Sequence, residues 1–123
     1  MIVGRMVGLQ ACVDVTFRLL NRPDLVIEFV VDTGFEGALT LPKAAVAALG
    51  LPFHQDIDAN LADDSNVSTD VHRATIVWEG LLLNVAVLAM GKRPLLGTAL
   101  LKESEFFAQF KSNGIVTIKN ASA

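Results

Sequence analysis

Apolar and polar side chains alternate between residues 13 and 19, the earliest regular pattern in the sequence. A period of two is that of a half-buried β-strand. Residues 21–24 read Asn-Arg-Pro-Asp, a composition typical of a turn. The following run, Leu25–Val31, is nearly all apolar and rich in β-branched residues, and it predicts a second, buried strand.

Shorter patterns of the same kind fill the rest of the chain. Pro42 can open a helix over Lys43–Leu49, and Gly50 can close it. Residues 63–66 are all turn formers, so the segments on either side predict a long hairpin. Further strands are expected at residues 38–41, 57–62, 67–77, 81–88, 95–97, 106–110 and 115–119, with a brief helix capped by Thr98 at residues 98–102. Together these elements predict one domain over residues 1–123, a small and mostly β barrel with one or two short helices.

The composition indicates an oligomer. Hydrophobic residues make up 52% of the 123 residues and the mean hydropathy is positive, which is high for a small soluble protein. The longest strongly apolar run, residues 81–90, contains Asn84 and is about half the length that a membrane-spanning helix needs. We therefore expect no association with a membrane, and we expect another subunit to cover the surplus apolar surface.

Charge and cysteine content argue against other classes of protein. The net charge of −3 disfavours a nucleic-acid partner, because phosphates require a basic face. Cys12 is the only cysteine, so no internal disulfide can form, and the first residues lack the long apolar region of a signal peptide. These features predict a reduced, cytoplasmic protein. His54 and His72 have no cysteine or glutamate at ligand spacing, so we expect no metal.

The candidate chemistry lies at Asp32, directly after the second predicted strand. A carboxylate at the end of a buried apolar strand costs free energy unless it is paired, hydrogen-bonded or useful. Thr33 adds a hydroxyl that can bond locally, and Gly34 allows a tight turn with a close backbone approach. The same triplet also fits an ordinary Asx-type turn after a strand, so alone it leaves both interpretations open.

The surroundings of the triplet resemble the retropepsin-like, or retroviral-type, aspartic proteases. Residues 29–39, Phe-Val-Val-Asp-Thr-Gly-Phe-Glu-Gly-Ala-Leu, are similar to that family's active-site strand and loop. About sixty residues later, Leu-Leu-Gly at residues 95–97 matches its second signature, two aliphatic residues and a glycine. The resemblance covers roughly residues 10–119. It implies a small closed barrel of the acid-protease type, with a flap hairpin whose tip lies at residues 63–66.

The resemblance implies roles for the matching residues. Asp32 would be catalytic, Thr33 would lock a homodimer by bonding across the two-fold axis, and Gly34 would shape the active-site loop. The strand expected to cross beneath this loop comprises Leu95, Leu96 and Gly97. The residues expected to contact an extended peptide or protein substrate are Phe35, Gly37, Ala62, Asp63, Asp64 and Ser65.

The mechanism that follows needs two carboxyl groups. Two such groups about 3 Å apart cannot both ionise cheaply, so the pair holds one proton. One group acts as general base on a water, and the protonated one polarises the peptide carbonyl. The chain carries a single Asp-Thr-Gly, so the second Asp32 must come from an identical chain. The resemblance thus implies a homodimeric aspartic endopeptidase that requires no metal or cofactor.

Two other functions remain compatible with the sequence. One is a non-catalytic dimeric protein-binding module on the same fold. It is suggested by acidic Asp63 and Asp64 at the flap tip, and by Phe35 where viral enzymes usually carry a small residue. The intact triplet argues against it, because a module that only binds has no chemical need for Asp32 on the axis. The other is an unrelated β-rich dimer in which the triplet is coincidental.

Overall fold

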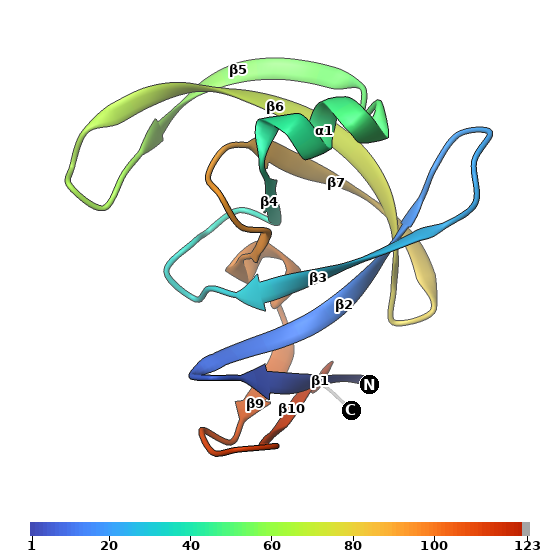
Figure 1. Cartoon of the computed structure of the whole chain (residues 1–123), viewed down its shortest axis with the longest axis vertical. Coiled ribbons are helices and arrows are strands. Elements are labelled where there is room, and N and C mark those ends of the chain that lie inside the picture. The colour runs from blue at the N-terminus through green and yellow to red at the C-terminus, as the bar shows by residue number, and fades with distance from the viewer. Residues whose placement is uncertain (122–123) are drawn as a thin grey trace.

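The computed structural model describes residues 1–121, and within them ten strands, one α-helix and one 3₁₀ helix follow one another (Figure 1). The strands are β1 (Ile2–Val7), β2 (Gln10–Arg18), β3 (Leu25–Val31), β4 (Leu39–Leu41), β5 (Phe53–Asn60), β6 (Asn66–Trp78), β7 (Leu81–Ala89), β8 (Leu95–Leu96), β9 (Ser104–Ala108) and β10 (Ile115–Asn120). Helix α1 covers Lys43–Leu49, and the 3₁₀ helix covers Thr98–Leu100. The prediction of a mostly β chain with short helices is confirmed.

The strands form one strongly curved sheet in the order β5-β6-β7-β4-β8-β3-β2-β1-β10-β9. Strand β6 pairs with β7 on one side, and its far half also pairs with β2 through Thr75–Val77 and Thr16–Arg18. The pairs β3–β8 and β4–β7 are parallel, and the others are antiparallel. Figure 1 shows the β5–β6 hairpin extending towards the upper left, and β1, β9 and β10 gathered at the bottom.

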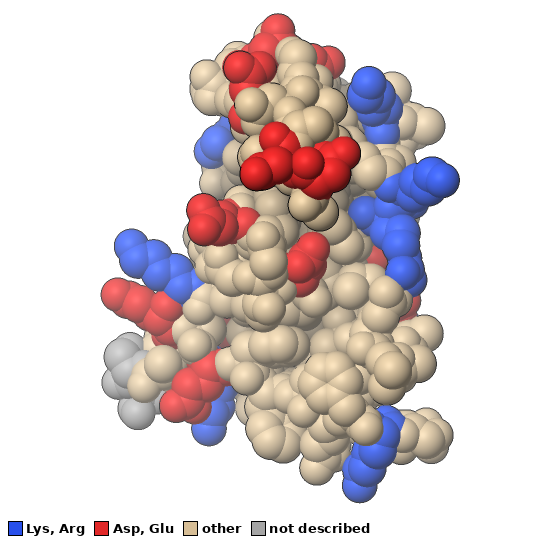
Figure 2. Space-filling view, turned by 90° about the vertical axis from the view of Figure 1, so that its left-hand side faces the viewer, with Lys and Arg blue, Asp and Glu red and all other residues tan. Residues whose placement is uncertain are grey.

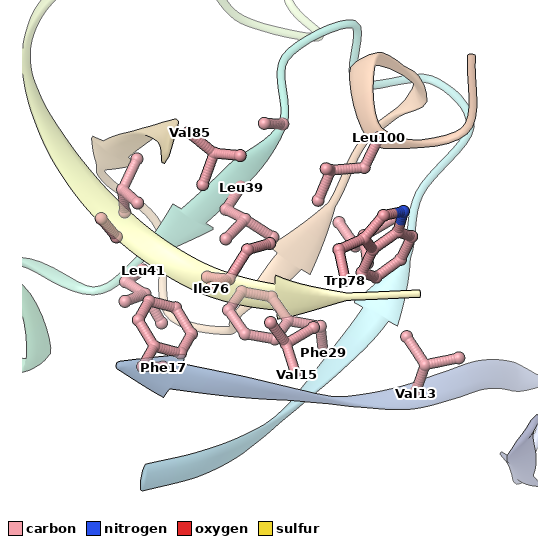
Figure 3. Packing of buried hydrophobic residues seen from close by; sticks show 14 of the residues in the cluster. Val13, Val15, Phe17, Phe29, Leu39, Leu41, Ile76, Trp78, Val85 and Leu100 are labelled. Carbon is pink, nitrogen blue, oxygen red and sulfur yellow. The ribbon is translucent and has the colours of Figure 1, made fainter. Parts of the chain in front are cut away.

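The core lies between the curved strands (Figure 3). The predicted alternation of β2 is confirmed, because Val13, Val15 and Phe17 are buried. Phe17 stacks on Phe29 of β3, with 5.9 Å between the ring centroids. Apolar burial is the dominant favourable term that holds such a sheet together, and a stacked aromatic pair adds to it. Around this pair pack Leu39, Leu41, Ile76, Val85, Trp78 and Leu100.

Helix α1 ends as the sequence predicts. Gly50 has φ 64°, the left-handed conformation that glycine adopts without a Cβ penalty, and its N–H caps the carbonyls of Ala47 and Val46. The predicted capping role of Thr98 is wrong. Gly97 occupies the cap position of the 3₁₀ helix, and the Thr98 hydroxyl donates to the carbonyl of Phe35 instead.

Three further expectations need correction. Strand β3 is not buried throughout, because Leu25 and Val26 are 42% and 57% exposed. Within residues 1–121, the first half of β3 pairs with β2 alone, whereas β8 pairs with Val30–Val31 at the end of β3. Strand β1 was not predicted, and the C-terminal strand expected at residues 106–110 runs two residues earlier, as β9.

Between residues 1 and 121, no helix has the length and apolarity to cross a bilayer.

Candidate active site

Asp32 leaves β3 on a backbone that β8 holds in place. The Asp32 N–H donates to the carbonyl of Leu96 at 2.9 Å, and Val30 N–H donates to Pro94 at 3.0 Å. These bonds extend the parallel β3–β8 pairing to the first residue of the loop. Asp32 itself is half-buried, so its carboxylate stands at the boundary between core and surface.

The loop after β3 fixes the direction of the Asp32 carboxylate. One of its oxygens, Oδ1, accepts the N–H of Gly34 at 2.9 Å, while the Asp32 carbonyl accepts the N–H of Phe35 at 3.1 Å. This is the Asx-type turn that the triplet permits, and it is compatible with a catalytic role because it orients the carboxylate. Thr33 and Gly34 lie exposed at the turn.

Gly97 lies directly beneath this loop. Its N–H donates to the carbonyl of Ala38 at 2.9 Å, and the next N–H, from Thr98, donates to Phe35 at 2.8 Å. A Cβ at Gly97 would lie 2.2 Å from the carbonyl oxygen of Gly37 and 2.5 Å from that of Phe35. Only a glycine allows the two segments to cross this closely. The structure thus brings the two sequence signatures, residues 29–39 and 95–97, into direct contact.

Phe35 lies against the glycines of the same crossing. A Cβ at Gly37 or at Gly97 would come within 2.5 Å of the Phe35 ring. The ring is half-buried in this arrangement. Phe35 therefore stabilises the loop by covering two glycines, in addition to any contact with substrate.

Thr40 is a site residue that the sequence analysis missed. It is buried in β4, and its hydroxyl accepts the N–H of Leu95 at 3.2 Å and donates to the carbonyl of Arg93 at 3.5 Å. It thereby holds β8 from the side opposite β3. The only signal in the sequence is a hydroxyl between Leu39 and Leu41, where a strand buried on both faces would carry an apolar residue.

The predicted flap tip is an exposed turn between β5 and β6. Asp63 accepts hydrogen bonds from the Ser65 hydroxyl at 2.6 Å and the Ser65 N–H at 3.0 Å, and these bonds lower the pKa of the Asp63 carboxyl. Ala62 and Asp64 are also exposed, and Asp64 has φ 68°. The structure places this tip on the same side of the molecule as the loop after β3 (Figure 1).

The hairpin that carries this tip is acidic. Residues 53–71 include five aspartates and no lysine or arginine. Figure 2 shows the face on which the hairpin and the loop after β3 lie, with acidic side chains gathered in its upper part. Below them, the lower centre of the face carries a broad uncharged area. Within residues 1–121, no three histidine, cysteine or acidic side chains are grouped as metal ligands would be.

Two aspartates of the hairpin face each other. Asp56 and Asp70 lie directly opposite each other in the β5–β6 register, and a hydrogen bond between their side chains raises the pKa of Asp56. The raised pKa of Asp56 stabilises the folded hairpin when the pH is below the ordinary aspartate pKa of about 4. This contribution is lost as the pH rises through the raised pKa. The lowered pKa of Asp63 acts in the opposite sense. Its contribution to stability is present above the ordinary pKa of about 4 and is lost as the pH falls through the lowered value.

We expect the hairpin to be more ordered near about pH 4 than near about pH 7, because at the lower pH the raised pKa of Asp56 favours its protonated form and the lowered pKa of Asp63 favours its ionised form. Amide protection factors along β5 and β6, measured by NMR across this range, check the expectation. In Asp56→Asn the difference should disappear. Asp58→Asn is the matched control, because Asp58 faces Ser68. Equal protection at both pH values in the unmodified protein would contradict the prediction.

Comparison with known proteins gives a likeness in structure but none in sequence. No protein-family model and no curated protein sequence matches the chain. Among solved structures, the crystal structure of a retropepsin-like aspartic protease from Rickettsia conorii superimposes with a TM-score of 0.60 at 17% sequence identity. The match covers 97% of this chain and 90% of that one. The chain described here therefore has the fold of a retropepsin-like aspartic protease.

Proposed function

We propose that this protein is an aspartic endopeptidase whose active site forms across a homodimer, with one Asp32 from each chain. The observation that carries the proposal is the setting of Asp32. Its backbone N–H is hydrogen-bonded to the carbonyl of Leu96, its carboxylate is oriented by the Gly34 N–H, and it lies half-buried at the boundary between core and surface. A carboxylate held this firmly at the end of a strand is suited to chemistry on a second molecule.

The two Asp32 groups would divide the catalytic work. One, ionised, would take a proton from a water held between them, and the other, protonated, would polarise the peptide carbonyl. The roles then reverse as the tetrahedral intermediate collapses. Thr33 would bond across the two-fold axis, and no metal or cofactor takes part. The substrate would be an extended peptide lying between the loop, at Phe35 and Gly37, and the flap residues 62–65.

The outer face of β1, β10 and β9 supports a homodimer. Val3 lies opposite Thr117, and Thr117 lies opposite Phe107, so the three side chains point to one side of the sheet. Ile115, two residues before Thr117, shares that side. Val3, Phe107 and Ile115 are 67%, 52% and 52% exposed. A second copy of the chain is the partner we propose for this apolar face, because a two-fold axis would pair it with itself.

Mixing two forms of the protein tests the shared site. When wild-type chains exchange with an equal amount of Asp32→Asn chains, random pairing leaves about half of the original wild-type pairs. We expect activity per wild-type chain to fall to about half, because a mixed pair contains one catalytic carboxylate. The measurement is peptide hydrolysis before and after subunit exchange. Activity that stays constant after full exchange would mean that a single chain cleaves alone.

The main alternative is a non-catalytic protein-binding module on the same fold. Phe35 gives it less support than the sequence suggested, because the ring packs on Gly37 and Gly97. The acidic flap tip still favours it. Binding of a pepstatin-type transition-state mimic that is lost in Asp32→Asn would separate the protease from the module. We also propose a cytoplasmic location, which the single free Cys12 supports.

A further inference from the structure

A second site lies on the side of the molecule away from Asp32. A pocket of about 470 Å³ opens between the end of α1, the loop joining β2 to β3, and strands β6 and β7. Figure 1 shows this β2–β3 loop at the right, beside α1, and the loop after β3 at the left. Pockets of this volume are in the range that holds small organic ligands. Nothing in the proposed peptidase mechanism uses it.

Three arginines and no acidic residue line the pocket. Arg18, at the end of β2, lies opposite Thr75 of β6, which lies opposite Asn84 of β7, so a polar row forms the floor. Arg73, two residues from Thr75 on the same strand, faces the same side and is half-buried. Arg22 enters from the β2–β3 loop.

Arg22 and Arg73 keep N–H groups available to bind a ligand. Arg18 donates to Asp24 at 2.7 Å, so its charge is compensated. Arg22 donates one N–H to the carbonyl of Ala48 near the end of α1, and Arg73 donates to Asn84 at 2.6 Å. Among residues 1–121, neither Arg22 nor Arg73 forms an ion pair with a carboxylate. Each guanidinium has five N–H groups, so both can still accept an anion in a forked geometry.

The walls of the pocket are apolar. Leu19, Leu49, Leu51 and Pro52 line it, and Leu20 stands at its rim with 87% of its surface exposed. An exposed leucine beside two uncompensated arginines offers both parts of a binding site for an amphipathic anion. The charged head would meet Arg22 and Arg73, and the apolar part would lie along the leucines.

We propose that this pocket binds a small organic anion, a carboxylate or a phosphate monoester carried on an apolar body. The ligand would bridge the β2–β3 loop to α1 and β6. A carboxylate and a phosphate monoester can each accept two hydrogen bonds from one guanidinium group, so the same arginines could bind either head group. The proposal is independent of the peptidase function, because the site and its test involve binding alone.

The test is titration of the full-length protein with straight-chain carboxylates and with alkyl phosphates of the same chain lengths, followed by calorimetry and amide NMR. We expect affinity to rise about fourfold for each added methylene until the pocket is filled. Alcohols of equal length should bind at least tenfold more weakly. Preference for one series identifies the head group.

Variants separate this site from general charge attraction. Arg73→Gln should weaken binding at least tenfold, and it leaves the bond from Arg22 to α1 in place. Arg93→Gln, which removes the same charge outside the pocket, should change affinity less than twofold. Leu20→Ser should reduce the dependence on chain length while both arginines remain. No binding of either series at millimolar concentration, or equal weakening by Arg73→Gln and Arg93→Gln, would overturn the proposal.

Discussion

Asp32→Asn is expected to lower the rate of peptide hydrolysis on the order of a thousandfold while the protein stays folded and dimeric. The amide side chain can still accept the Gly34 N–H through its oxygen, so the loop keeps its shape. It cannot take a proton from water, and the loss of such a group typically costs this much rate. The assay is cleavage of a peptide library at several pH values, with size-exclusion chromatography to verify the dimer.

Glu36→Gln is the matched control for the Asp32 variant. It removes one carboxylate from the same loop, at an exposed position that we interpret as solvated. We expect its activity to remain within a few-fold of the wild type. A rate that is undiminished in Asp32→Asn, or that falls equally in both variants, would contradict the catalytic assignment.

Gly97→Ala is expected to have the largest effect on stability. The new Cβ would lie 2.2 Å from the oxygen of Gly37 and 2.5 Å from that of Phe35, both backbone atoms that cannot rotate away. Separating the segments would also stretch the bonds from Gly97 to Ala38 and from Thr98 to Phe35. We expect a loss of about 3 kcal/mol or more, a large share of a typical free energy of unfolding. Urea unfolding measures it.

Gly80→Ala distinguishes crowding from backbone strain. Gly80 has φ 77°, but no atom lies within 4 Å of the place that a methyl group would take, so its substitution tests conformation alone. The expected cost is about 1 kcal/mol. If Gly97→Ala costs no more than Gly80→Ala, then the close crossing beneath the loop after β3 is not the constraint that we describe.

Much of the central fold could be predicted from the sequence. The apolar run ahead of Asp32, the proline and glycine bounding α1, and the alternation in β2 each reflect a local rule, and the structure confirms each element. Strand β1 escaped prediction because Gly4 and Arg5 interrupt its pattern. The glycine is explained by a contact between strands. A Cβ at Gly4 would lie 2.1 Å from the carbonyl oxygen of Cys12, so glycine allows β1 to approach β2.

The candidate site also combines features that the sequence predicts with features that depend on tertiary packing. The two signatures could be located by resemblance, but the packing of Phe35 on Gly37 and Gly97 depends on how β8 crosses the loop. Threonine is a common helix-capping residue, yet the Thr98 hydroxyl donates to the carbonyl of Phe35, because the crossing brings that carbonyl within reach. The arginine pocket draws on segments near residues 20, 50 and 75, and no local pattern links them.

The parallel pairs beneath Asp32 have a consequence for the order of folding. Val30 pairs with Leu95, and Leu39 pairs with Val87, so the support of the loop joins segments that are distant along the chain. Such contacts form slowly, since long loops must close first. A nascent chain that has reached only residue 90 has no β8 to hold Asp32. The carboxylate would acquire its orientation only after residues 95–97 have been synthesised, more than sixty residues after Asp32 itself.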